Sequence, residues 1–264
     1  MRRQIAALVV GCLLVVAGAI YAVVKALPLL LSGVVWLVPL SVEDKLGEAV
    51  VGGMIQGDPI CDDADTRAMM DAIVQRLRLA SAPNPYGFEV RVVRNSQVNA
   101  IAAPGGHVIV FSGLIDRMDN PEQVAAALAH EMQHVIQRHS MKGIVRGLGM
   151  QAFLSLVVGN PGILGDLTGN LGALHFARSD EVSADDGALD TLLRAEIAPS
   201  QMEQAFENLA KSTGADPMGA SLKYLSTHPP LEERIARVKD RAAGRVFSNR
   251  PIGVRMAHPC AASN

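Results

Sequence analysis

Two histidines four residues apart, with a glutamate beside the first, form the strongest chemical signal in the sequence. His130, Glu131 and His134 lie in the segment Ala-His-Glu-Met-Gln-His at residues 129–134. Residues four apart on a helix project from one face, a spacing that lets two imidazole nitrogens bind one Zn²⁺. Glu131 then lies about 100° around the helix, where it can act as a base without binding the metal. The alternative is an ordinary amphipathic helix that binds nothing.

A catalytic zinc typically has three protein ligands and one open position, so a third ligand is needed. His139 follows five residues after His134, and on a continuous helix it points about 140° away. Glu181 and Asp185 are four apart and share a helix face. Glu181 is the best candidate for the third ligand: one of the two carboxylates can bind the metal while the other accepts an N–H from a ligating imidazole, which fixes the tautomer. The alternative is a solvated acidic helix start.

The helix that presents His130 is expected to begin near Asn120. Asn120 is a favourable N-cap, Pro121 suits the first helical position, and Gln123 can close a capping box. Earlier in the chain, helices are expected at 41–54 and 65–79, with Asp65 as the cap of the second, and strands at 88–93, 100–102 and 108–111. A few early strands ahead of many helices predict an α+β fold that is predominantly α-helical, with a small three-stranded sheet.

Composition restricts the class of protein. The chain has 264 residues, 49% of them hydrophobic, a net charge of −2 and 4% aromatic residues. This hydrophobic content excludes a disordered chain, and the absence of a basic surplus argues against a nucleic-acid partner. We expect an N-terminal anchor and interfacial segment at 1–40, one catalytic domain at 41–250 and a C-terminal tail at 251–264.

The N-terminus carries the most apolar stretch. Arg2 and Arg3 precede an uncharged run at residues 5–24, and about 20 helical residues span the roughly 30 Å hydrocarbon core of a bilayer. A retained membrane-anchor helix is the favoured interpretation, followed by an interfacial segment anchored by Trp36. A cleaved signal peptide with its site near Ala19, or a lipoprotein modified at Cys12, are the alternatives. Each of them places the remaining chain outside the cytoplasm, on the periplasmic side if the source is bacterial.

Cys61 and Cys260 would then lie in an oxidising compartment. They either form a disulfide that ties the C-terminal tail to an early helix or remain as two unpaired thiols, and the sequence leaves both possibilities open.

Four ordered blocks resemble the HtpX / CAAX prenyl-protease family of gluzincin zinc metallopeptidases, including its BepA-like relatives. The blocks are Val-Asn-Ala-Ile-Ala-Ala-Pro-Gly-Gly at 98–106, the HExxH segment with its following Arg-His at 130–139, Arg-Ser-Asp-Glu-Val-Ser-Ala-Asp at 178–185, and Thr-His-Pro-Pro with Arg-Ile at 227–235. The resemblance covers about residues 41–240. We expect the chain to depart from multi-spanning members in having one membrane span, and from BepA-like members in having no helical-repeat domain.

The resemblance implies roles for further residues. Glu181 would be the third zinc ligand, and Asp185 would support a histidine. His228 would aid the oxyanion or cap a resting zinc, although it is otherwise a loop histidine before a proline. The stretch that contains Asn99, Ala100 and Ala102 would be an edge strand that pairs with an extended peptide, or it would only support the sheet.

These observations together predict a membrane-anchored zinc metalloendopeptidase. It would hydrolyse peptide bonds in extracytoplasmic or membrane-associated proteins, above all misfolded ones, with Glu131 as the base and polypeptides as its partners. The alternatives are a non-hydrolytic zinc-stabilised binding or chaperone module of the same fold, and a processing protease with a single client. An apolar stretch at 150–158, followed by several glycines, is expected to form either a flap near the cleft or a plain surface hairpin.

Overall fold

The computed structural model describes residues 35–55, 57–148, 176–215, 231–244 and 246–260, together with Ser155, His228 and a few residues before 35. The chain divides into two compact units, Met1–Val38 and Pro39–Asn264. No helix among the described residues is long and apolar enough to cross a bilayer. Most of the expected anchor at 5–24, and all of the expected flap at 150–158 except Ser155, lie outside the described residues.

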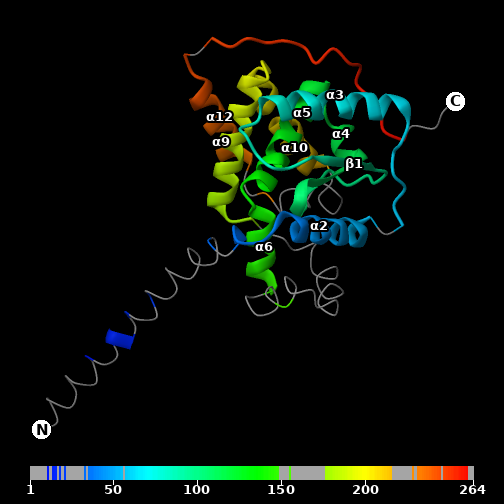
Figure 1. The fold of residues 1–264 in the computed structure, drawn as a ribbon. Helices are drawn as coiled ribbons and strands as arrows, with labels where there is room; N and C mark the ends of the chain where they lie inside the picture. The colour runs from blue at the N-terminus through cyan, green and yellow to red at the C-terminus, as the bar shows by residue number, and fades with distance from the viewer. Residues whose placement is uncertain are drawn as a thin grey trace, which may run out of the picture. The chain divides into compact units, whose positions relative to one another are not determined.

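The second unit is mostly helical with one small sheet, which confirms the expected α+β class (Figure 1). Its elements in chain order are α2 (Leu40–Met54), α3 (Ala64–Ala80), β1 (Glu89–Val93), β2 (Ala100–Ala102), the 3₁₀ turn η1 (Pro104–Gly106), β3 (His107–Phe111), α4 (Ser112–Ile115), α5 (Pro121–Ile136), α6 (His139–Leu148), α9 (Arg178–Arg194), α10 (Pro199–Ala215) and α12 (Leu231–Ala242).

The sheet is mixed and has the strand order β1-β3-β2. β3 pairs in parallel with β1 and antiparallel with β2. All five residues of β3 are buried, as expected for a central strand with an apolar sequence. β2 therefore lies at an edge of the described sheet, which is the position that peptide pairing would require.

Helix α5 forms the centre of the domain and packs against α3, α9 and α10 (Figure 1). Alanines at 125, 126, 127 and 129 are buried, and their small side chains allow neighbouring backbone to approach closely. Asn120 caps the helix as predicted, because its Oδ1 accepts the Gln123 N–H at 3.0 Å. The expected capping box is modified, since the Gln123 side chain accepts the N–H of Asp119 rather than that of Asn120.

The expected cap of α3 is wrong by two residues. Asp63, not Asp65, is the N-cap, and its Oδ1 accepts the Thr66 N–H at 2.9 Å. Asp65 lies inside the first turn, where its charge still favours the positive end of the helix.

A disulfide between Cys61 and Cys260 selects one of the two alternatives left open by the sequence. It fastens the tail at 246–260 across the domain, where Ala257 joins the buried core.

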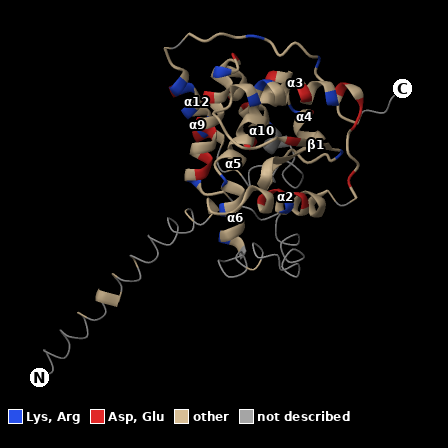
Figure 2. Cartoon of the chain, in the orientation of Figure 1, with Lys and Arg blue, Asp and Glu red and all other residues tan. Residues whose placement is uncertain are grey.

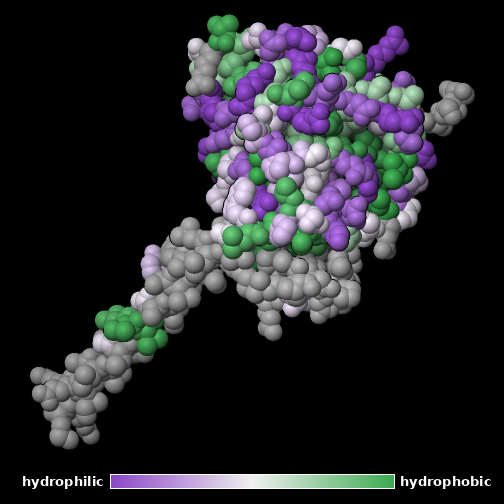
Figure 3. All heavy atoms as spheres, viewed as in Figure 1, coloured by the Kyte–Doolittle hydropathy of each residue, from purple (hydrophilic) through white to green (hydrophobic). Residues whose placement is uncertain are grey.

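The surface formed by α3, α9 and α12 is largely hydrophilic. Charged side chains are frequent on these three helices (Figure 2), and most of the atoms on this part of the domain belong to hydrophilic residues (Figure 3).

Candidate metal centre

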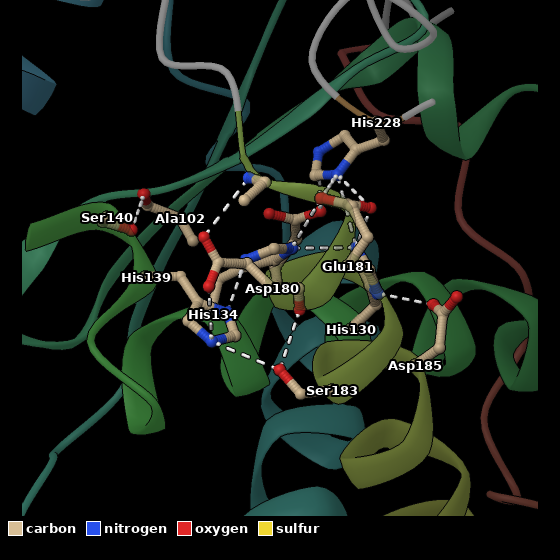
Figure 4. Close-up of polar contacts among 12 residues, drawn as sticks. Ala102, His130, His134, His139, Ser140, Asp180, Glu181, Ser183, Asp185 and His228 are labelled. Carbon is tan, nitrogen blue, oxygen red and sulfur yellow. Dashed lines mark hydrogen bonds and ion pairs between the residues drawn. The ribbon is translucent and has the colours of Figure 1, made fainter. Parts of the chain in front are cut away.

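Four buried side chains converge beside α5 (Figure 4). His130 and His134 come from one face of α5, Glu181 from the first turns of α9, and His228 from the chain before α12. One ligand atom from each lies within 4.8 Å of all the others. The three residues expected to bind the metal are thus brought together, and His228 joins them.

The donor atoms face one another. The Nε2 atoms of His130 and His134 are 3.0 Å apart, and the Glu181 carboxylate lies 3.4 Å from His134 Nε2 and 3.6 Å from His130 Nε2. His228 Nδ1 lies 2.9 Å from Glu181 Oε1 and 3.3 Å from His130 Nε2. Three nitrogens and a carboxylate around one point are ligands that suit zinc.

Burial and neighbouring charges keep the expected ligands in metal-binding forms. Burial lowers the pKa of His130, and it lowers that of His134 to about 4, so both rings are neutral and offer lone pairs. Burial opposes the charge of Glu181, but His228 and a hydrogen bond from His134 outweigh it and lower the pKa of this carboxyl. For His228, burial lowers the pKa, but the Glu181 and Glu131 carboxylates produce a net rise.

Glu131 is 1% exposed and lies next to these donors without belonging to the group. Its Oε1 is 3.7 Å from His228 Nε2, and its Oε2 has no hydrogen-bond partner among the described residues. A buried carboxylate oxygen without a hydrogen-bond partner destabilises the folded protein, unless a further group in the site bonds to it. The four donors and this oxygen together fit a bound cation with an associated water.

Asp185 lies where the sequence places it, beside a ligating ring. Its Oδ1 is 2.9 Å from Nδ1 of His130. Arg234 of α12 donates to both oxygens of Asp185, at 2.7 and 2.8 Å, and its guanidinium lies 4.2 Å from the centre of the Phe206 ring. Burial raises the pKa of Asp185, but Arg234 and His130 lower it by more. Arg234 stands in the last of the four sequence blocks, but no sequence pattern predicts its contact with Asp185.

The prediction that His139 points away from the site is wrong. It assumed one continuous helix, whereas α5 ends at Ile136 and Arg138 has a φ of 56°. This break starts α6 at His139 and brings its Nδ1 to 3.1 Å from Nδ1 of His134. Burial lowers the pKa of His139 to about 3. His139 is outside the group of four donors, so it contacts the expected ligand His134 and does not itself belong to the donor group.

The expected substrate strand partly bonds within the chain. The Asn99 carbonyl accepts the Phe111 N–H, and its side-chain Oδ1 accepts the Ala100 N–H at 3.0 Å. Since Asn99 and Ala103 bond to β3 through their backbone, the backbone groups of Ala100 and Ala102 point away from β3, towards the unpaired side of the described sheet. The Ala102 carbonyl accepts the Ser140 hydroxyl at 2.6 Å. Among the described residues, the carbonyl of Ala100 and the N–H of Ala102 are the other groups that point away from β3, and both residues are buried, at 3% and 0% exposed.

Comparison with known proteins adds an independent finding. The model of Peptidase family M48 matches residues 62–242. Metalloprotease LoiP of Escherichia coli K12 is 31% identical over 201 residues, which cover 70% of this chain and 78% of LoiP. Mitochondrial metalloendopeptidase OMA1 of Schizosaccharomyces pombe is 28% identical, covering 66% of this chain and 52% of OMA1. The beta-barrel assembly-enhancing protease of Escherichia coli K12 is 28% identical, covering 76% of this chain and 44% of that protein. The chain thus spans most of LoiP but about half of the other two.

Proposed function

The chain belongs to peptidase family M48, and on this basis we propose that it is a membrane-anchored zinc metalloendopeptidase that hydrolyses misfolded extracytoplasmic or membrane-associated proteins. The single observation that carries the proposal is the convergence of two rings from α5 and one carboxylate from α9 beside the buried Glu131. A purely structural zinc site tends to close its fourth position and needs no base. Glu131 therefore supports hydrolysis over a zinc-stabilised binding module.

The residues that would hold zinc are His130, His134 and Glu181. When bound, zinc would supply a Lewis acid that favours deprotonation of a water and polarises a carbonyl. Two neutral imidazoles and one carboxylate around Zn²⁺ would leave a net positive charge, and this charge would attract an electron-rich carbonyl oxygen.

The protein's own groups would handle the proton and the developing charge. Glu131 would take the proton of the attacking water through its buried carboxylate and return a proton to the leaving amine. His228, 3.7 Å from Glu131, would donate an N–H to the oxygen of the tetrahedral species, the kind of interaction that contributes most to acyl-transfer catalysis.

Edge pairing supplies a way to bind unfolded substrates. The Ala100 carbonyl and the Ala102 N–H would bond to the main chain of an extended peptide once this buried edge is uncovered, and such pairing recognises backbone rather than side chains. Such binding suits polypeptides that expose extended segments because they are misfolded.

The proposed location has two supports. The uncharged run at 5–24 follows Arg2 and Arg3, as expected for an anchor whose basic end stays in the cytoplasm. The disulfide between Cys61 and Cys260 is typical of compartments outside the reducing cytosol.

The test of hydrolysis is Glu131→Gln in the full-length protein, with casein as an unfolded substrate. We expect this variant to keep its zinc, measured by elemental analysis, and to lose cleavage. Glu48→Gln makes the same chemical change at an exposed position of α2 and should cleave like the wild type. Chelation should abolish cleavage, and added zinc should restore it. Wild-type rates in Glu131→Gln would refute the assignment of the base.

Substrates can be identified with the same variant as a trap. Proteomics of membrane and secreted fractions, with wild type or Glu131→Gln expressed, should show many unrelated polypeptides retained by the inactive variant. Retention of one well-folded protein alone would instead favour a processing protease with a single client.

A further inference from the structure

We propose that Glu43 of α2 is a positioning residue for His134, and that it acts through Arg138 and His139. The proposal rests on the proposed function in one respect: it takes His134 as a metal ligand. Glu43 lies outside the four motif blocks, 91 positions before His134 in the chain.

Glu43 forms a buried charge cluster with two residues from other elements. It is 1% exposed, and its Oε2 accepts the Tyr86 hydroxyl at 2.9 Å. Its Oε1 is 3.2 Å from Nε of Arg138, which also donates to the Tyr86 oxygen at 3.0 Å. A buried carboxylate and guanidinium that share a hydroxyl are bound tightly, because losing one leaves the other charge without compensation in a dry environment. The cluster therefore fixes Arg138 to α2.

Arg138 is the residue at which the chain leaves the catalytic helix. Its φ of 56° lies in the left-handed region, which residues other than glycine adopt only when the surroundings hold them there. The ion pair with Glu43 and the hydrogen bond to the Tyr86 oxygen supply such a hold. The left-handed residue ends α5 and sets the direction in which α6 begins.

The first residue of α6 is His139, and it contacts the ligand. Its Nδ1 is 3.1 Å from Nδ1 of His134, whereas Nε2 of His134 faces His130. If His134 binds metal through Nε2, its Nδ1–H must donate to His139. Nε2 of His139 then faces Ser183 Oγ at 3.4 Å and Asp180 at 3.7 Å. An outer bond of this kind fixes the tautomer and orientation of a ligating ring.

Helix α2 has its own attachments, so Glu43 is not required merely to dock it. Asp44 Oδ1 lies 2.9 Å from Nε2 of His107, and Gly47 packs directly on the carbonyl of Pro104. Leu46, Val50 and Val51 are also buried. These contacts hold α2 to η1 and β3. Loss of the Glu43 charge is therefore expected to loosen the turn between α5 and α6 at Arg138 more than the packing of α2.

The experiment is a double-mutant cycle on metal affinity in the full-length protein. Glu43→Gln should weaken zinc binding about tenfold or more, the usual effect of losing an outer contact to a ligand, measured by chelator competition. It should also alter the visible spectrum of the Co²⁺-loaded protein. In a His139→Ala background, Glu43→Gln should cause no further loss, because residues that act in series are not additive. Tyr86→Phe, which removes one hydroxyl, should cause a smaller loss in the same direction.

Arg76→Ala is the matched control for general destabilisation. Arg76 donates to the carbonyls of Ala195, Arg250 and Pro251, and it takes no part in the cluster or the metal centre. If Glu43→Gln weakens zinc binding no more than Arg76→Ala does at an equal loss of melting temperature, the proposal is overturned. Full additivity with His139→Ala overturns it as well. A wild type that binds zinc but cleaves nothing would defeat the proposed function, while the affinity cycle would still decide this inference.

Discussion

Asp185 Oδ1 lies 2.9 Å from Nδ1 of His130, and the other ring nitrogen of His130 faces Nε2 of His134 at 3.0 Å. The carboxylate favours the tautomer of His130 with its proton on Nδ1, which would leave Nε2 available to the expected metal, while Nη2 of Arg234 also lies 3.1 Å from Nδ1. Arg234 bonds both oxygens of Asp185, so the orientation of this ring is fixed by α9 and α12 together.

Asp185→Asn should lower zinc affinity by about 10- to 100-fold, because an amide is a weaker acceptor and does not raise the basicity of the ring. Chelator competition measures the change. Asp186→Asn is the matched control: the neighbouring carboxylate faces Arg241 at a partly exposed position and should leave zinc affinity unchanged. If the two substitutions lower zinc affinity equally, the affinity depends on the net charge of α9 and not on the bond from His130 to Asp185.

His228→Ala should retain zinc and lose activity. Three ligands remain in this variant, which is the usual set of a catalytic zinc. Losing one donor to a developing oxyanion typically lowers kcat by about 10²–10³. Zinc content and casein cleavage are to be measured on the same sample, with the exposed His258→Ala as control. Loss of zinc in step with activity would instead make His228 the fourth ligand.

Two glycines of α2 should respond oppositely to alanine. A Cβ on Gly47 would overlap the carbonyl of Pro104, and forcing α2 from η1 should cost about 1–3 kcal/mol of unfolding free energy. A Cβ on Gly52 would meet no atom within 4 Å, so alanine there should be neutral or stabilise by up to about 1 kcal/mol. Urea unfolding monitored by circular dichroism distinguishes them. Similar midpoints would mean that α2 does not pack on η1 in solution.

The disulfide should contribute measurably to stability. Its cysteines are separated by 199 positions, and removing a native disulfide typically costs about 2–5 kcal/mol. Reductant should therefore lower the melting temperature of the wild type but not that of Cys260→Ser. If reductant leaves the melting temperature of the wild type unchanged, the result would favour the alternative that the sequence also allowed, in which the two thiols are unpaired.

Local patterns in the sequence were sufficient for the elements near the site. Asn120 and Pro121 begin α5 as predicted, because an N-cap and a proline at the first position act through their immediate neighbours. The convergence of Glu181 on the two histidines was also anticipated, because a catalytic zinc needs a third ligand and the 178–185 block resembles the one that supplies it in the family. The cap at Asp63 was missed because three aspartates lie within four positions, each with a favourable side chain.

Long-range contacts and one backbone angle could not be predicted from patterns in the sequence. The helix break at Arg138 carries no glycine or asparagine to signal a left-handed residue, so an extrapolated helix placed His139 on the wrong side. The bonds from Glu43 to Arg138 and from Arg234 to Asp185 join positions 95 and 49 apart, which no periodicity can reveal. The sequence thus predicted which side chains come together, whereas the network that orients them could be seen only in the fold.

The link between Cys61 and Cys260 encloses both helices that supply the expected metal ligands. A proteolytic enzyme is exposed to its own cutting, and any single nick between those cysteines would yield two fragments that stay covalently joined. Such a molecule would run as one band in electrophoresis without reductant and as two bands with it. Self-digestion inside this span would therefore not shed either half of the catalytic domain.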